Sequence, residues 1–204
     1  MERKTVRINP GDPREEQFKS MAYEALQPQN LRIIARGPEN RKNSDIECIE
    51  KYGMYFYVAG KVTNGDVYNV FKQKYSTEDL CAAMKNTASS ARIGTFEEAV
   101  FDEMNKIEDF NPHGIGMYIL SNDGRENAAG LMLCEGVMLM LKQKIGDFWI
   151  APSSIHELII IPVSDESFFD RDYVVSMVRE VNHSVVRPDD RLVDNAFFFD
   201  GMIH

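Results

Sequence analysis

Apolar residues near the start of the chain recur at the spacing of an α-helix. Between residues 13 and 26 the apolar positions are Phe18, Met21, Ala22 and Leu26. Steps of three or four residues place such positions on one helical face. Pro13 stands at the first turn, where a helix tolerates proline best. We therefore predict a helix over 13–26.

The first strand pattern covers residues 54–62. This run is rich in aromatic and β-branched residues and is followed by Asn64 and Gly65, so it is typical of a β-strand that ends in a turn. After the turn, Asp66 is a suitable N-cap. We predict a short helix from Asp66 through Tyr75.

Two further helices are predicted from paired capping residues. Ser76 is followed three positions later by Asp79, and Thr95 in the same way by Glu98. Such pairs satisfy free backbone N–H groups at the start of a helix from both directions. We expect a helix directly after Ser76 and another directly after Thr95.

The second half of the chain has the order β-α-β-β-α-β. Its strands are predicted over 116–120, 148–151, 157–162 and 195–199, and its helices over 127–145 and 170–181. The two middle strands are close enough for an antiparallel hairpin. This order favours an α+β fold, a mixed β-sheet with helices packed on it. We expect one domain over 1–204, with 105–113 as the only candidate for a seam.

The predicted helix 127–145 is apolar on most of its sides, with Asn127 as its N-cap and Gly146 after its end. Such a helix is usually buried against a sheet or a partner. The chain holds 11 methionines, three of them in this helix. Flexible thioethers suit either an adaptable binding groove or an irregular core. The aromatic strand at 197–199 is either central or an edge used for association.

Acidic residues outnumber basic ones, and the imbalance grows toward the C-terminus. The 204 residues carry 23 Lys and Arg against 32 Asp and Glu, for a net charge of −9. The net charge is +2 over residues 1–61, −4 over 62–145 and −7 over 146–204. A phosphate backbone is repelled by such a C-terminal third, which argues against nucleic acid as a partner there.

Hydropathy and cysteine usage bear on the compartment. No apolar run reaches the roughly 18 residues of a membrane-spanning helix, and the first residues lack the apolar stretch of a signal peptide. The cysteines, Cys48, Cys81 and Cys134, show no Cys-x-x-Cys spacing, which argues against a disulfide framework and a cysteine zinc site. We expect a cytoplasmic protein without membrane contact, and an inert core thiol at Cys134.

Several motifs in the later part of the chain occur together in a known family. They are Pro152–Glu157, which is the most specific, and Lys85–Thr87, Met117–Asn122, Ala128–Gly130, Val178–Asn182 and Leu192–Asn195. In these motifs the chain resembles domain of unknown function 5688, over about residues 80–204. The resemblance implies a cytoplasmic protein of Gram-positive anaerobic bacteria, the Firmicutes, and it implies no particular activity.

The predicted hairpin loop 153–157 concentrates polar side chains of the catalytic types. Serine supplies a nucleophile, histidine a base, and Asp165 or Asp194 an acid that orients the base. No Gly-x-Ser-x-Gly elbow surrounds the serines, and the same residues suit a tight turn in which the hydroxyls bond the local backbone. No catalytic role is assigned. The candidates are Ser153, Ser154, His156 and Glu157.

Metal and cofactor motifs give no assignment. The histidines and acids that a metal site would draw on lack ligand spacing such as His-Glu-x-x-His. They include His113, His156, Glu157 and His183. The run 114–116 lacks the third glycine of a dinucleotide fingerprint, and no P-loop occurs.

These observations favour a non-enzymatic binding or interaction domain. Its partner would be another protein or a second copy of the chain, bound through an apolar or acidic surface. The competing hypothesis is a hydrolase-like enzyme that uses Ser153 or Ser154 together with His156 and Glu157 in the hairpin loop.

Overall fold

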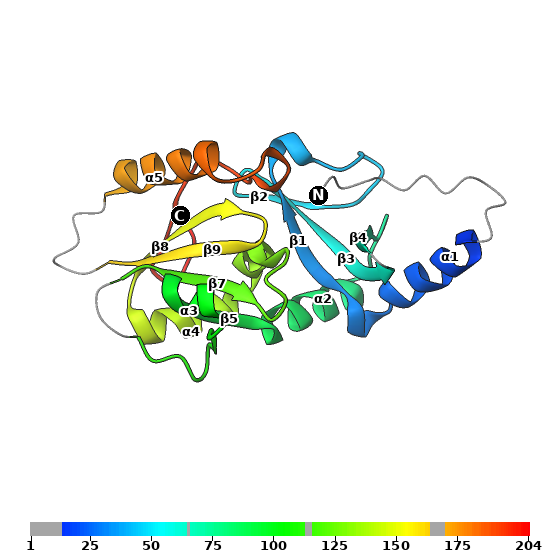
Figure 1. The fold of residues 1–204 in the computed structure, drawn as a ribbon, viewed down its shortest axis with the longest axis horizontal. Coiled ribbons are helices and arrows are strands. Elements are labelled where there is room, and N and C mark those ends of the chain that lie inside the picture. Colours follow the sequence, from blue (N-terminus) through cyan, green and yellow to red (C-terminus); the bar gives the residue numbers. More distant parts are fainter. Residues whose placement is uncertain (1–13, 65, 113–115, 164–169) are drawn as a thin grey trace.

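The chain forms two β-sheets that lie next to each other along the long axis of the molecule (Figure 1). The computed structural model describes residues 14–64, 66–112, 116–163 and 170–204. The smaller sheet consists of β1 (Arg32–Arg36), β2 (Ile49–Lys51), β3 (Met54–Asn64) and β4 (Asp66–Phe71). The larger sheet has the strand order β10-β8-β9-β7-β5-β6. Its strands are β5 (Ala91–Thr95), β6 (Asn105–Lys106), β7 (Tyr118–Asn122), β8 (Phe148–Ser154), β9 (Glu157–Pro162) and β10 (Phe197–Phe199).

Helices surround and join the sheets. The α-helices are α1 (Arg14–Ala25), α2 (Thr77–Ser89), α3 (Phe96–Phe101), α4 (Glu135–Ile145) and α5 (Arg171–Ser184). Short 3-10 helices are η1 (Pro28–Asn30), η2 (Pro38–Asn40), η3 (Ala128–Leu133) and η4 (Pro188–Asp190). The α+β class predicted from the sequence is therefore confirmed. No helix in the described ranges is long and apolar enough to cross a membrane.

The prediction of a mixed sheet is wrong. Every strand pair in the described part of both sheets is antiparallel. The predicted order β-α-β-β-α-β is confirmed as β7, α4, β8, β9, α5 and β10. Among the described strands of this half, only the hairpin of β8 and β9 joins sheet neighbours directly. Strands β7 and β8 run in the same direction, but β9 lies between them, and β8 likewise separates β9 from β10, so no parallel pair forms.

Two local predictions of helix are also wrong. The segment from Asp66 is strand β4, which pairs with β3 from Asn64↔Asp66 to Ala59↔Phe71. The pairing satisfies the backbone N–H and C=O groups of a run rich in β-branched and aromatic residues, which favour strands. This contribution outweighs the preference of Asp66 for the start of a helix. Asn127 does not cap a long helix, because it adopts a left-handed φ of 53° and is followed by η3 instead. The α-helix begins only at Glu135.

Both predicted capping boxes are present. In α2, Ser76 accepts from the backbone N–H of Asp79, whose carboxylate accepts from Ser76 in return. Thr95 and Glu98 make the same reciprocal pair at the start of α3. These helix starts depend on contacts within four residues, which explains why the sequence alone locates them.

The main hydrophobic core contains side chains from both sheets. Ile33 and Phe56 come from the smaller sheet, and Met138, Ile150 and Leu158 from α4 and the larger sheet. Together with Met132, the burial of Met138 shows that methionines of this segment fill the core. A second, smaller cluster packs α5 on the opposite face of the larger sheet, so that α4 and α5 lie on opposite sides of it (Figure 1).

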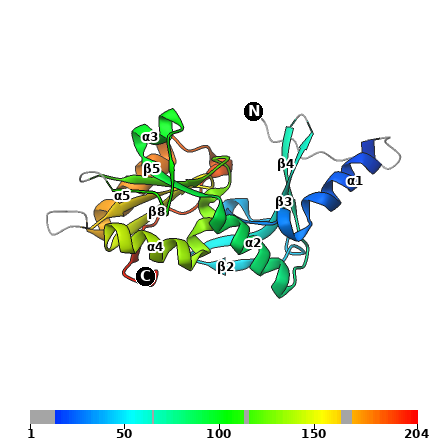
Figure 2. The same ribbon diagram turned by 90° about the horizontal axis from the view of Figure 1, so that it is seen from below.

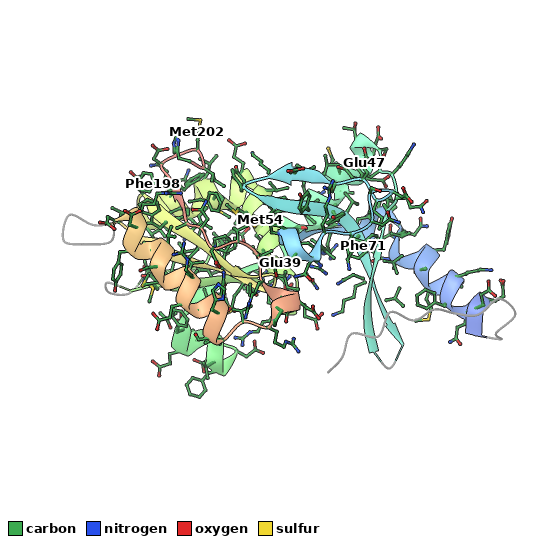
Figure 3. The ribbon with its side chains drawn as sticks, turned by 90° about the horizontal axis from the view of Figure 1, so that it is seen from above. Glu39, Glu47, Met54, Phe71, Phe198 and Met202 are labelled. Atoms are coloured by element: carbon green, nitrogen blue, oxygen red, sulfur yellow. The ribbon has the colours of Figure 1, made fainter. Side chains whose placement is uncertain are left out.

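The aromatic strand β10 is an edge strand of the larger sheet. The C-terminal residues fold back along it, and Phe198 and His204 exchange backbone hydrogen bonds of 2.9 and 3.3 Å. Phe198 and Met202 mark this end of the molecule in Figure 3. The edge is therefore covered by the chain itself.

Strand β1 is held by two elements at the junction of the sheets. Helix α2 lies across this junction (Figure 2), and Thr87 Oγ1 accepts a hydrogen bond from Ile33 N–H at 2.9 Å. The backbone of η3 approaches the same residue. A Cβ atom on Gly130 would lie 2.1 Å from the carbonyl oxygen of Ile33. Only glycine permits such a backbone approach.

Replacing this glycine should destabilise the fold. Gly130→Ala forces η3 away from β1, and we expect a loss of about 1–3 kcal/mol in the free energy of unfolding, the usual cost of overpacking. Urea denaturation followed by circular dichroism measures the loss. The control is Gly136→Ala in α4, whose added methyl group meets no heavy atom within 4 Å. Equal stabilities of the two variants would contradict the close approach.

Cys134 is buried, as its surroundings in the sequence predict. Its side chain is 4% exposed, and burial raises the pKa of the thiol to about 12. The thiolate, which is the reactive form, is therefore scarce at neutral pH. Cys81, in contrast, is exposed.

We expect a thiol reagent to modify Cys81 but not Cys134 in the native protein at neutral pH. Reaction with dithionitrobenzoate followed by peptide mass spectrometry gives the modified positions. In denaturant, Cys134 should react like the other cysteines. Rapid modification of Cys134 without denaturant would show that the thiol is accessible in the native state.

Candidate functional site

The turn between β8 and β9 lies inside the molecule. Ile155 at its tip is fully buried. Its N–H donates to the carbonyl of Asp190 at 2.9 Å, and its carbonyl accepts from Ala129 N–H at 3.1 Å. The hairpin loop that concentrates the candidate catalytic residues is therefore bonded to η3 on one side and to η4 on the other.

His156 makes polar contacts through its backbone and its ring. Its N–H donates to Ser154 Oγ at 3.1 Å, and its carbonyl accepts from Ser121 Oγ at 2.9 Å. Ring Nδ1 accepts from the backbone N–H of Asn127 at 3.4 Å. Ring Nε2 lies 3.6 Å from Asp190 Oδ1, a buried carboxylate.

This geometry supports the interpretation of the loop as a turn. Because Nδ1 faces an N–H donor, the neutral ring carries its proton on Nε2, which faces the Asp190 carboxylate. A base for serine needs a ring nitrogen directed at the hydroxyl, whereas the contact between Ser154 Oγ and His156 runs through the backbone N–H of His156. Ser154 Oγ accepts from a backbone N–H, as in a serine turn. The catalytic role of Ser154 and His156 stays a prediction.

The other sequence candidates occupy different places. Ser153 belongs to β8, but its side chain lies outside the described part of the structure, as do His113 and Asp165. Asp194 is bonded to α5, where Asn182 Nδ2 donates to its Oδ1 at 2.7 Å. His183 Nε2 lies 3.1 Å from Asp194 Oδ2.

The acid beside His156 is Asp190, and no motif in the sequence indicates this role for it. Arg187 Nη2 also pairs with Asp190, at 2.8 Å. In the sequence, the adjacent acids at 189–190 are typical of a solvated turn. The residues near them do not indicate that η4 packs on the hairpin. In the described ranges, no three His, Cys, Asp or Glu side chains are grouped so that they could hold a metal ion.

Glu157, at the start of β9, is half-buried. Burial raises the pKa of its carboxyl group above the ordinary 4.5, and the nearby Arg125 charge lowers it in part. The native state therefore binds a proton at Glu157 more readily than the unfolded chain does. As the pH rises from below 4.5 through the raised pKa, ionisation of Glu157 costs the fold stability.

We expect Glu157→Gln to be more stable than the original protein near neutral pH, because the amide carries no charge to desolvate. The difference should shrink as the pH falls, and vanish below the ordinary carboxyl pKa. Urea unfolding at a series of pH values measures it. Glu180→Gln, at an exposed position of α5, is the matched control. A gain that does not depend on pH would contradict the burial argument.

An exposed apolar surface lies on α3, at the periphery of the larger sheet (Figure 2). We call it the α3 ridge and define it as Phe96, Val100 and Phe101. Their side chains are 47%, 76% and 66% exposed. The sequence pattern indicates these apolar positions, but α3 is only six residues long, too short for periodicity to tell a buried face from an exposed one.

Acidic residues alternate with the α3 ridge along the chain. The segment 96–103 holds Glu97, Glu98, Asp102 and Glu103 and no basic residue. Glu98 is occupied by the capping box, whereas Glu97, Asp102 and Glu103 are exposed. Arg125 Nε lies 3.4 Å from Asp102 Oδ1. The ridge is therefore an apolar strip with an acidic border.

A comparison with protein families agrees with the resemblance in the motifs. The model of a family described as "Family of unknown function (DUF5688)" matches residues 68–201. The chain belongs to this family. No curated protein and no solved structure matches the chain significantly. The DUF5688 match begins within β4, so that most of the smaller sheet precedes it.

Side chains in the DUF5688 motifs bond distant parts of the backbone together. Asn86 Nδ2 donates to the carbonyls of Pro28 and Leu31 at 2.9 and 3.1 Å. Asn182, buried in α5, donates to the carbonyl of Val193 at 3.3 Å. Together with the hairpin turn, these contacts show that the motifs which carry the DUF5688 resemblance hold the fold together.

Proposed function

We propose that this protein is a non-enzymatic interaction domain whose α3 ridge binds a basic, apolar-faced segment of a partner protein. The observation that carries the proposal is the exposure of three large apolar side chains within one six-residue helix. Burying a side chain of this kind is worth about 1.5–3 kcal/mol. Contiguous exposed apolar patches with polar rims are typical of protein interaction sites.

The charge around the ridge determines the kind of partner. Two copies of the chain that met symmetrically through the ridge would bring Glu97, Asp102 and Glu103 of one copy toward the same acids of the other. Like charges at an interface oppose association. A nucleic acid is disfavoured for the same reason. A partner with Lys or Arg beside its apolar residues can bury the apolar side chains of the ridge and form ion pairs with the acids of its border.

The non-enzymatic part of the proposal rests on the hairpin. Among the described side chains, His156 Nδ1 accepts from Asn127 N–H and Nε2 lies near Asp190, and Ser154 Oγ accepts a backbone hydrogen bond. A nucleophile and a base that are committed to a turn must give up these contacts before they can react. This is the reason to prefer binding over the hydrolase-like alternative.

A designed helical peptide tests the interaction. A fluorescent peptide with a leucine face and lysines beside it should bind, and its affinity should fall at least about tenfold in Phe101→Ser, because a central apolar contact is lost. Fluorescence anisotropy measures the affinity. Val185→Ser, which removes an exposed valine next to α5, away from the ridge, should bind like the original protein.

Three outcomes would count against the proposal. Equal binding of a peptide with glutamates in place of the lysines would refute the basic partner. A dimer in light scattering that Phe101→Ser converts to monomer would favour self-association instead. Hydrolysis of p-nitrophenyl acetate that both Ser154→Ala and His156→Ala abolish would favour the hydrolase-like alternative.

A further inference from the structure

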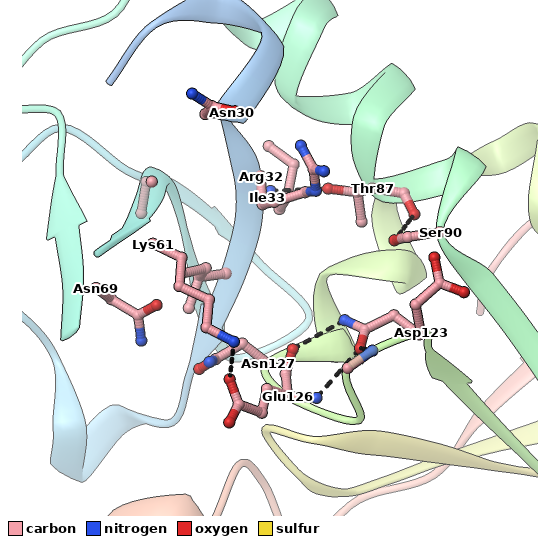
Figure 4. A pocket seen from close by; sticks show the side chains of 15 residues that line it. Asn30, Arg32, Ile33, Lys61, Asn69, Thr87, Ser90, Asp123, Glu126 and Asn127 are labelled. Atoms are coloured by element: carbon pink, nitrogen blue, oxygen red, sulfur yellow. Dashed lines mark hydrogen bonds and ion pairs between the residues drawn. The ribbon is translucent and has the colours of Figure 1, made fainter. Parts of the chain in front are cut away.

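A pocket of about 310 Å³ lies where the two sheets meet. Strands β1, β3 and β4 of the smaller sheet form one wall, and the loop 122–127 between β7 and η3 forms the wall opposite (Figure 4). The C-terminal end of α2 closes one side through Thr87 and Ser90. The pocket uses none of the hairpin candidates and none of the α3 ridge.

The wall on the smaller sheet is cationic. Arg32 of β1 and Lys61 of β3 both line the pocket. Asn69 of β4 lies directly opposite Lys61 in the antiparallel register, so its amide shares the same face of the sheet. Arg32 is half-buried, and its Nη1 donates to the carbonyl of Leu31 at 2.7 Å.

The opposite wall is anionic. Asp123 and Glu126 of the loop line the pocket. Lys61 Nζ lies 2.8 Å from Glu126 Oε2, so one ion pair spans the gap between the walls, as Figure 4 shows. Asp123 forms an ion pair with Arg92, which does not line the pocket.

The loop that forms the anionic wall is held by its own hydrogen bonds. Asn122 Oδ1 accepts from the N–H groups of Gly124 and Glu126, both at 3.1 Å, and its Nδ2 donates to the carbonyl of Glu126 at 2.8 Å. Arg125 and Asn127 adopt left-handed φ values of 50° and 53°. Non-glycine residues hold this conformation only where the surroundings impose it, and such strain gathers at functional sites.

Two walls of opposite sign select the charge of a ligand. A simple anion is attracted by Arg32 and Lys61 but repelled by Asp123 and Glu126. A simple cation is attracted by the two acids but repelled by the two basic residues. A ligand with an anionic and a cationic end is attracted by both walls. Its anionic end takes the place of Glu126 beside Lys61, and its cationic end takes the place of Lys61 beside Glu126. The volume of about 310 Å³ is at the lower end of the range of about 300–1,000 Å³ that is usual for ligand pockets, which suits a small ligand such as an amino acid.

We propose that this pocket binds a small zwitterion of the α-amino acid type. Its carboxylate faces Arg32 and Lys61, and its ammonium group faces Asp123 and Glu126. The amide of Asn69 is placed to contact the ligand beside Lys61. Because hydrogen bonds of Asn122 hold the loop, little ordering of the loop opposes binding. This inference does not depend on the proposed role of the α3 ridge.

Titration calorimetry with the full-length protein tests the inference. The ligands are the common L-amino acids and L-alanyl-L-alanine, which carries the same two groups farther apart. At least one should bind, and its N-acetyl and amide derivatives, each lacking one charge, should bind at least about tenfold more weakly, a difference in affinity that calorimetry resolves. Comparing the affinity for the dipeptide with that for the free amino acids shows which of the two ligand types the pocket prefers. These arms use the unaltered protein, so they do not depend on the folding of a variant.

Single variants then assign the charges. Lys61→Gln and Glu126→Gln should each weaken binding at least tenfold, whereas Lys142→Gln should not. Lys142 lies on α4, and this change breaks its ion pair with Asp147, which follows the helix. Thermal melting of each variant reports whether it folds. The inference is overturned if no zwitterion of the panel binds at millimolar concentration, if the N-acetyl derivative binds as tightly as the free amino acid, or if Lys61→Gln and Lys142→Gln bind alike.

Discussion

The attachment of β1 to α2 and η3 is the contact on which the arrangement of the two sheets depends. Thr87 Oγ1 accepts from Ile33 N–H and donates to the carbonyl of Ala83 at 2.8 Å, while Gly130 brings η3 against the same strand. An edge strand exposes unpaired backbone groups. Thr87 satisfies the N–H group of Ile33, and Gly130 lies against its carbonyl group. They also fix how far the smaller sheet lies from loop 122–127, and therefore the width of the pocket.

Loop 122–127 contacts the hairpin turn, strand β1 and the end of α3. Its Asn127 donates from the backbone to His156 of the hairpin and accepts from Arg36 Nη1 of β1 at 3.0 Å. Its Arg125 pairs with Asp102 at the end of α3. The hairpin, which the sequence indicates as a candidate site, thus holds this loop in place. The charged side chains that line the pocket belong to the loop and to the smaller sheet.

Local signals in the sequence were sufficient for much of the fold. The capping boxes of α2 and α3, the hairpin of β8 and β9, and the end of α4 at Gly146 were all predicted, because each depends on residues near one another in the chain. The charge gradient along the chain was also visible. It has a spatial counterpart, since the cationic wall of the pocket comes from residues 32 and 61 and the anionic wall from residues 123 and 126.

The sequence by itself determined where most helices and strands begin, which segments are apolar, and that hydroxyl, imidazole and carboxylate groups gather in the hairpin loop. Only the tertiary structure decided how these pieces meet. The segment from Asp66 is a strand because β3 pairs with it, and Asn127 departs from helical geometry where its backbone contacts the hairpin. Asp190 reaches His156 from 34 positions away. Such contacts join residues distant in the chain, and no local pattern encodes which distant groups will share one site.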